Sequence, residues 1–152
     1  MKSIFECTAE HRAACPVVLD ELPAVIRKRT GWDYSFTQTD SGCFLKPTFR
    51  DMPYHNSFVP EIDVVISRND TQTVLHFRGQ PVKALRIFMG FWFGFLLPME
   101  LLFLVLAFTS HMDSLFPVFI PLITMVFGYL LCKLATRAIF HSIVKAIQNI
   151  SR

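Results

Sequence analysis

Two long apolar stretches, separated by six residues, constrain this chain more than any other feature of its sequence. The first ends at Phe108 and the second begins at Leu115, with Thr109–Ser114 between them. Each provides about 20 apolar residues, which as an α-helix cross a bilayer core of about 30 Å. We therefore expect a transmembrane helical hairpin over residues 83–135, with spans at about 86–108 and 115–134.

Basic residues flank these stretches on one side only. The link Thr109–Ser114 contains no Lys or Arg. The opposite ends carry Arg78, Lys83, Arg86, Lys133, Arg137 and Lys145. Because cytoplasmic loops hold the excess of Lys and Arg, we expect both termini in the cytoplasm and residues 109–114 outside. The expected location is integral to the cytoplasmic membrane.

The first 82 residues differ in composition, since they mix charges, prolines and short alternating runs. Trp32, Tyr34 and Phe36 alternate with polar residues, and a period of two is typical of half-buried strands. The sequence predicts a cytosolic α+β module over residues 1–82, with four or five mostly antiparallel strands and a helical segment. We expect residues 1–80 to fold alone.

The helical segment of this module is predicted between Pro16 and Gly31, which are typical start and stop signals. Pro23 lies inside it, so two short helical pieces or a kink are expected. Residues 4–7 form a short strand candidate. After the spans, residues 136–152 predict an amphipathic C-terminal helix that rests on the inner leaflet or on the module.

The net charge of +3 is modest, and no basic run is interleaved with aromatic residues, so no nucleic-acid partner is expected. The densest basic cluster, Ile26–Trp32, indicates a solvated helix end or a contact with anionic lipid. Cys7, His11 and Cys15 would align on a helix, but no fourth ligand is in register. We predict no metal and no cofactor.

The stretch "MPYHNSFVP" covers residues 52–60, between two predicted hairpins. Together with "FRGQPVK" and the aromatic-rich first span, it resembles a group of small uncharacterised bacterial two-span membrane proteins with an Asn-Ser-Phe-x-Pro stretch before the first span. The resemblance runs from Phe44 to Trp92, and Asp63 stands where that group is expected to have glycine. It implies a two-span protein of a bacterial inner membrane and implies no activity.

Tyr54, His55, Asn56 and Ser57 are candidate binding residues within this stretch. Polar residues between strands and bounded by prolines suit a loop that binds a ligand. They also suit a structural loop, because Asn and Ser hydrogen-bond to local backbone. The chain has no Gly-x-Ser-x-Gly, His-Glu-x-x-His or Gly-rich phosphate motif. An enzyme that uses this loop is therefore the weakest alternative.

Glu100 is the only carboxylate inside either predicted span. An ionised carboxylate at the bilayer centre costs about 2.5–3.5 kcal/mol. An equal depth along the second span reaches Thr124, with Tyr129 as a deeper alternative. Three interpretations stay open: a neutral acid bonded to Thr124 or to a kink carbonyl, an oligomer interface, and passage of ions or protons.

Three further residues of the first span predict how it packs. Gly90 and Gly94 form a small-xxx-small pattern, which lets another helix approach closely. Pro98 cannot donate to the carbonyl of Gly94, so a kink is expected there. This pattern therefore suits a homo-oligomer in which copies of the chain contact one another through the spans.

These features predict a small integral membrane protein with a cytosolic binding, sensing or interaction module, and not an enzyme. The alternative is an oligomeric membrane effector or channel with Glu100 facing its lumen. The expected partners are the lipid bilayer, a second copy of the chain and a small ligand that the sequence does not identify.

Overall fold

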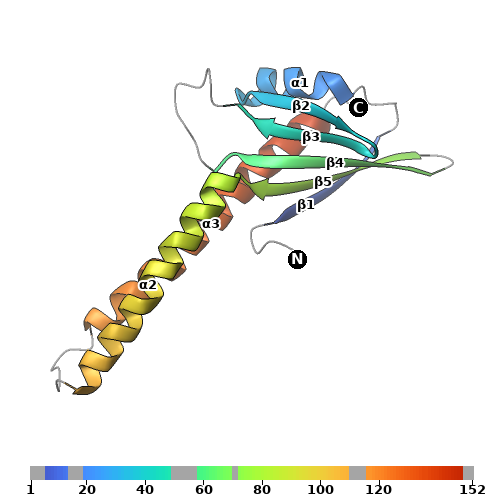
Figure 1. Ribbon diagram of the computed structural model, residues 1–152. Coiled ribbons are helices and arrows are strands. Elements are labelled where there is room, and N and C mark those ends of the chain that lie inside the picture. Colours follow the sequence, from blue (N-terminus) through green and yellow to red (C-terminus); the bar gives the residue numbers. More distant parts are fainter. Residues whose placement is uncertain (1–5, 14–18, 49–57, 70–71, 110–115, 149–152) are drawn as a thin grey trace. The chain divides into compact units, whose positions relative to one another are not determined.

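The computed structural model describes residues 6–13, 19–48, 58–69, 72–109 and 116–148 of the chain. Figure 1 labels its elements in chain order. They are β1 (Cys7–Ala13), the 3-10 helix η1 (Leu19–Glu21), α1 (Leu22–Thr30), β2 (Tyr34–Thr39), β3 (Gly42–Pro47), β4 (Pro60–Asn69), β5 (Gln72–Pro81), α2 (Lys83–Thr109) and α3 (Phe116–Gln148).

The chain divides into two compact units. The first consists of Met1–Val82 together with Ala135–Arg152, and the second of Lys83–Leu134. Helix α3 contributes to both, because it runs without interruption from Phe116 to Gln148. The first unit is therefore discontinuous in sequence.

The first unit is built on one antiparallel sheet with the strand order β1-β5-β4-β3-β2. Side chains alternate between its two faces. Val64 on the central strand β4 lies opposite Cys43 and Phe77, and all three are buried. Its neighbour Asp63 pairs in regular register with Phe44 and Arg78, so this position does not need glycine. The predicted α+β layout of antiparallel strands with a helical segment is confirmed.

Helix α1 ends where its sequence indicates. Gly31 has φ 75°, and its N–H donates to the carbonyl of Arg27 at 2.9 Å, a left-handed cap that favours glycine. Pro23 lies in the first turn of α1, where a missing N–H costs nothing. The break expected at this proline is therefore a change from η1 to α1, and Pro16 lies outside the described residues.

Strand β1 runs from Cys7 to Ala13, so Cys7 of the strand predicted over residues 4–7 is in a strand and Glu6 is not, while residues 4 and 5 lie outside the described residues. Its position depends on β5, with which it pairs from Cys7 opposite Gly79 to Ala13 opposite Thr73. This pairing joins residues that are at least sixty positions apart in the sequence. A local propensity for strand could not show it.

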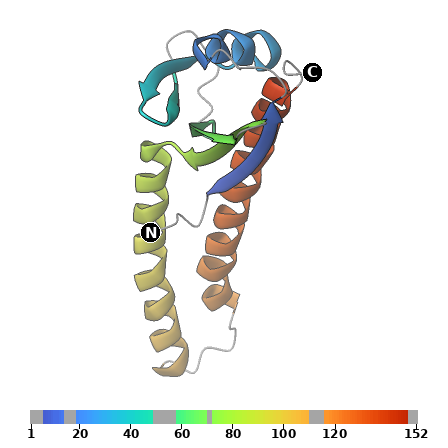
Figure 2. The same ribbon diagram turned by 90° about the vertical axis from the view of Figure 1, so that its right-hand side faces the viewer.

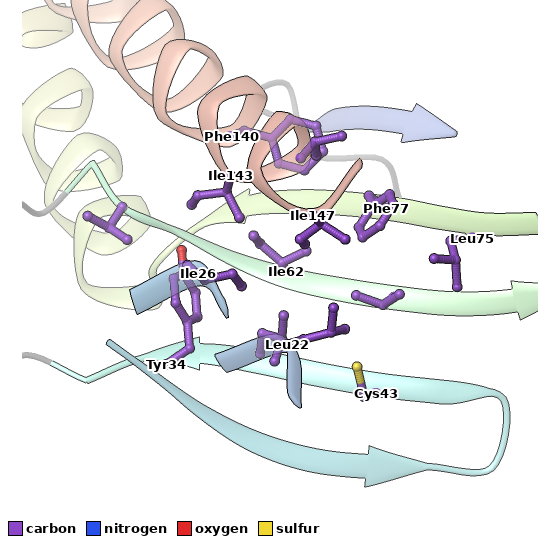
Figure 3. Packing of buried hydrophobic residues seen from close by; sticks show 14 residues of the cluster. Leu22, Ile26, Tyr34, Cys43, Ile62, Leu75, Phe77, Phe140, Ile143 and Ile147 are labelled. Carbon is purple, nitrogen blue, oxygen red and sulfur yellow. The ribbon is translucent and has the colours of Figure 1, made fainter. Parts of the chain in front are cut away.

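One face of the sheet carries the hydrophobic core of the first unit (Figure 3). The C-terminal turns of α3 pack there, because Phe140, Ile143 and Ile147 are buried in the same cluster as Ile62 and Phe77 of the sheet. Of the two supports expected for the C-terminal helix, the structure therefore shows the sheet. The core is not closed by the first 82 residues alone.

Gly79 on β5 makes room for the ring of Phe140. A Cβ atom added to Gly79 would lie 2.4 Å from Cδ2 of Phe140, which is closer than real Cβ atoms approach. The Phe140 ring thus sits directly against the backbone of β5. This contact ties the end of α3 to the sheet.

The second unit consists of α2 and the first part of α3 (Figure 2). Both helices are long and apolar enough to cross a membrane. The most apolar 18-residue window of α2 has no buried residue, and that of α3 is 17% buried. The first unit buries its large apolar side chains. The second unit exposes many of its own, as Phe91 at 75% and Phe127 at 66% exposure show.

Candidate functional site

One face of α2 is half-buried and contains the intramembrane candidate Glu100. Trp92, Leu96, Glu100 and Phe103 recur every three or four residues and share intermediate exposure. Oε2 of Glu100 is buried and has no hydrogen-bond partner among the described residues. A buried, unpaired carboxylate oxygen is costly, and each such atom calls for an explanation.

Thr124, the predicted partner of Glu100, bonds within its own helix. Its hydroxyl donates to the carbonyl of Ile120 at 2.7 Å, the i−4 bond that Thr makes readily inside helices. Among the described residues the structure shows no hydrogen bond between Thr124 and Glu100. Tyr129, the deeper alternative, accepts a hydrogen bond from Nζ of Lys133 at 3.1 Å.

Gly90 and Gly94 lie on the exposed side of α2. An added Cβ atom would meet nothing within 4 Å at either glycine. Pro98 is also exposed and lies inside the helix. The predicted packing face is therefore open within this chain, and its use by a second copy stays a prediction.

Of the described glycines in the hairpin, Gly128 of α3 is the one where an added Cβ atom would reach a side chain of the other helix, at an ordinary contact distance. A Cβ atom there would lie 3.7 Å from Nε1 of Trp92. Thr124, Gly128 and Cys132 are small residues at four-residue intervals on a half-buried or buried face. This is the same spacing as Gly90 and Gly94, and it was the signal that would have identified this face from sequence.

A shallow groove on the face of the sheet opposite the core is the candidate site of the first unit. It has a volume of about 530 Å³. It crosses three neighbouring strands, β1, β5 and β4, on the face opposite the core. Its polar lining consists of Thr8, Glu10, Asp63, His76 and Arg78.

One ion pair and one contact between a histidine and a carboxylate order the side chains of this groove. Arg78 holds Glu6 in a two-point contact, with Nε–Oε1 at 2.8 Å and Nη2–Oε2 at 3.0 Å. Nδ1 of His76 lies 3.2 Å from Oε1 of Glu10. Asp63 has no ion pair among the described residues. In the sheet it lies opposite Phe44 on β3 and Arg78 on β5. The groove therefore offers one carboxylate without an ion pair among the described residues, and Phe44 of β3 lies opposite it in the sheet, outside the groove lining.

The carboxylate of Asp63 also affects the pKa of a thiol on the other side of the sheet. Burial, and secondarily the carboxylate of Asp63, raises the pKa of Cys43 to about 11. This thiol is buried in the core and stays protonated at neutral pH. Cys43 is thus a packed core residue and has none of the thiolate character that a reactive cysteine requires.

The binding loop predicted at Tyr54, His55, Asn56 and Ser57 lies outside the described residues. The enzyme alternative, which rests on this loop, stays a prediction. Within the described part of the chain, no three His, Cys, Asp or Glu side chains are grouped to hold a metal ion.

Comparison with family models, curated proteins and solved structures finds no match to this chain. The resemblance of residues 44–92 to two-span bacterial proteins therefore stays a prediction. Function is best inferred from the two faces described above, one on the sheet and one on α2.

Proposed function

We propose that the protein is an integral membrane protein that presents a non-enzymatic binding module at the cytoplasmic surface of the membrane. In this proposal α2 and the first part of α3 cross the bilayer. The first unit remains in the cytoplasm with both termini.

The exposure of the second unit carries the proposal. All nineteen large apolar side chains that are exposed in the described residues lie between Ile87 and Leu134. Burying one such side chain is worth about 1.5–3 kcal/mol, so this surface strongly favours an apolar surrounding. A helix that is apolar on every side is typical of a membrane span or of a helix enclosed by other protein.

The charges of the second unit support the orientation. Its described residues carry Lys83, Arg86 and Lys133 toward one end of the hairpin and Glu100 within it. The positive-inside rule assigns the basic end to the cytoplasm. The link 109–114, which has no Lys or Arg, is then outside.

Labelling of introduced cysteines tests this topology in intact cells, in a background without the four native cysteines. His111→Cys is expected to react with a membrane-impermeant maleimide, and Ser67→Cys is not. Cys43 is unsuitable as the internal reporter, because burial in the core protects it on either side of the membrane. Ser67 is exposed on β4, so its protection would report the membrane itself. Reaction of Ser67→Cys from outside would overturn the orientation.

The groove on the sheet is the proposed binding surface of the module. Asp63, which has no ion pair among the described residues, suits a cationic group, and Phe44 opposite it on β3 would add an aromatic face that also attracts positive charge. A photo-crosslinking residue at Thr8 is expected to give a discrete adduct in cells, which Asp63→Lys abolishes. The same residue placed at Lys28 on α1, also exposed, is the matched control and should give no such adduct.

A second candidate function rests on Glu100. Its unpaired Oε2 favours an oligomeric effector or channel in which copies of the chain surround this carboxylate. The test is ion or proton flux in liposomes together with the oligomeric state in nanodiscs. Glu100→Gln should abolish flux and leave assembly intact, because the amide cannot ionise. A monomer without flux would remove this candidate.

A further inference from the structure

The exposed side of α3, after the apolar surface ends, carries three basic residues beside the small residues Ala138 and Ser142. Arg137, His141 and Lys145 follow one another at intervals of four residues, and all three are exposed. Because a helix places such residues on one side, they form a continuous basic stripe. No Asp or Glu occurs anywhere in α3.

The stripe lies opposite the face that α3 buries. Phe140, Ile143 and Ile147 are in the core of the first unit, while Arg137, His141 and Lys145 point away from it. None of the three basic residues forms an ion pair with a described residue. The stripe is therefore not used to hold α3 on the sheet.

The contacts of the stripe leave its charge uncompensated. Nε of Arg137 donates to Nε2 of His141 at 3.5 Å, a long contact between two basic side chains. His141 also packs edge-on against Phe140, with ring centroids 5.8 Å apart.

The position of the stripe along α3 identifies the anion. The last exposed large apolar residue of α3 is Leu134, at 62% exposure. If the hairpin crosses the membrane as proposed above, the hydrocarbon ends near this residue. Arg137 lies about 4.5 Å farther along the helix, His141 about 10.5 Å and Lys145 about 16.5 Å, at about 1.5 Å per residue.

These heights match the layer of lipid headgroups. That layer is about 5–7 Å thick on each side of the bilayer core, and the field of an anionic surface decays over about 8 Å at physiological salt. Arg137 thus lies within the headgroups, His141 beyond their outer edge but within one decay length of it, and Lys145 more than one decay length from it. We infer that Arg137 and His141 bind the phosphate groups of anionic phospholipids in the inner leaflet, with Arg137 as the main contact.

This inference depends on the proposed membrane location, so the experiment separates the two. The full chain is reconstituted into nanodiscs of phosphatidylcholine alone and into nanodiscs with equal parts phosphatidylcholine and phosphatidylglycerol. Insertion into the neutral nanodiscs tests the membrane location by itself. Native mass spectrometry of protein released from the mixed nanodiscs then gives the ratio of the two lipids retained.

The wild type is expected to retain phosphatidylglycerol preferentially. Arg137→Gln should lower this preference about fivefold, the equivalent of about 1 kcal/mol per basic side chain at an anionic surface. Arg137→Lys should keep it, because the charge remains. Lys145→Gln should change it less than twofold, and Arg12→Gln, exposed on β1, should leave it unchanged. Far-UV circular dichroism confirms that each variant is folded.

Three outcomes would overturn the inference while the membrane location stands. Insertion without any lipid preference is the first. Equal losses in Arg137→Gln and Lys145→Gln are the second, because a site at headgroup depth must distinguish these heights. The third is displacement of phosphatidylglycerol by millimolar inorganic phosphate, which would make the stripe a site for a soluble anion. Failure to insert into neutral nanodiscs would overturn the proposed function and the inference together.

Discussion

The two parts of α3 show how one helix is used in two environments. From Phe119 to Leu134 its large apolar residues are exposed on several sides, as Ile123 at 63% and Phe127 at 66% illustrate. From Ala135 onward the apolar residues form one buried stripe, and the opposite side is basic. A helix that packs on a sheet needs one apolar face, whereas a helix surrounded by lipid needs apolar residues on every side. The change of pattern at Leu134 marks the boundary between the two units.

The largest expected effect is the loss of the first unit without the end of α3. A fragment of residues 1–82 lacks four residues that are buried in the core of the first unit, namely Phe140, Ile143, Val144 and Ile147. We expect this fragment not to unfold cooperatively, contrary to the sequence-based expectation that residues 1–80 fold alone. Calorimetry and circular dichroism of the fragment measure this.

The matched control joins residues 1–82 to 135–152 through a short flexible linker. It should regain a cooperative transition, and Phe140→Ala in that protein should cost about 3–5 kcal/mol. A cooperative transition in the 1–82 fragment alone would show that α3 merely covers a sheet that is already stable.

Each unit contains a buried polar atom without a hydrogen-bond partner among the described residues. These atoms are Oγ1 of Thr136 in the first unit and Oε2 of Glu100 in the second. Removing the charge with Glu100→Leu should stabilise the hairpin, by up to about 2.5–3.5 kcal/mol if the carboxylate is ionised in the bilayer. Thr136→Val, of similar shape, should stabilise the first unit by about 1 kcal/mol.

Unfolding in nanodiscs by a chemical denaturant compares these two variants. If Glu100 has a functional role, Glu100→Leu should lose flux or ligand response while its stability rises, and Thr136→Val should lose neither. Destabilisation by Glu100→Leu would show that the carboxylate holds the fold through a partner, which would contradict its unpaired state.

Much of this fold could be predicted wherever the cause is local. Gly31 stops α1 because the left-handed cap favours glycine, and the alternation of Tyr34 and Phe36 places β2. The two long apolar helices follow from composition alone. These features depend on neighbours within one turn or one strand.

The candidate sites could be predicted less well, because they depend on distant pairing. Glu10 and His76 meet only because β1 lies beside β5, and nothing near either residue indicates this. The hydrogen bond between Thr124 and Glu100 was predicted from their equal depth in the membrane alone. The Thr124 hydroxyl instead bonds to the carbonyl of Ile120, which is always within reach in the same helix.

The same glycine substitution should have opposite effects in the two units. Gly79→Ala puts a methyl group against the Phe140 ring and should destabilise the first unit by about 1–3 kcal/mol. Gly90→Ala meets nothing within 4 Å and should stabilise α2 by up to about 1 kcal/mol through helix propensity. Thermal unfolding of the two variants gives the comparison.

Gly90→Ile sharpens this comparison, because it tests whether Gly90 and Gly94 serve a second copy. A larger side chain on an interface between copies should shift the protein from oligomer to monomer in nanodiscs, while the monomer remains folded. An unchanged oligomeric state would mean that lipid alone covers this face.

The last comparison is a pH dependence confined to the first unit. The pKa of Cys43 is about 11 in the folded chain, against 9.0 for an ordinary cysteine, because burial and then Asp63 disfavour the thiolate. Between these two values the folded state holds more protons than the unfolded state, so its stability falls as pH rises through this window. Below pH 9 the thiol is protonated in both states and stability does not depend on it. Urea unfolding of the linked protein of residues 1–82 and 135–152 from pH 7 to 10.5 should show this decline, and Cys43→Val should reduce it. The hairpin has a buried cysteine of its own among the described residues, Cys132. The linked protein lacks the hairpin, so Cys132 does not contribute to its pH dependence. An equal decline in Cys43→Val would assign the pH dependence to other groups.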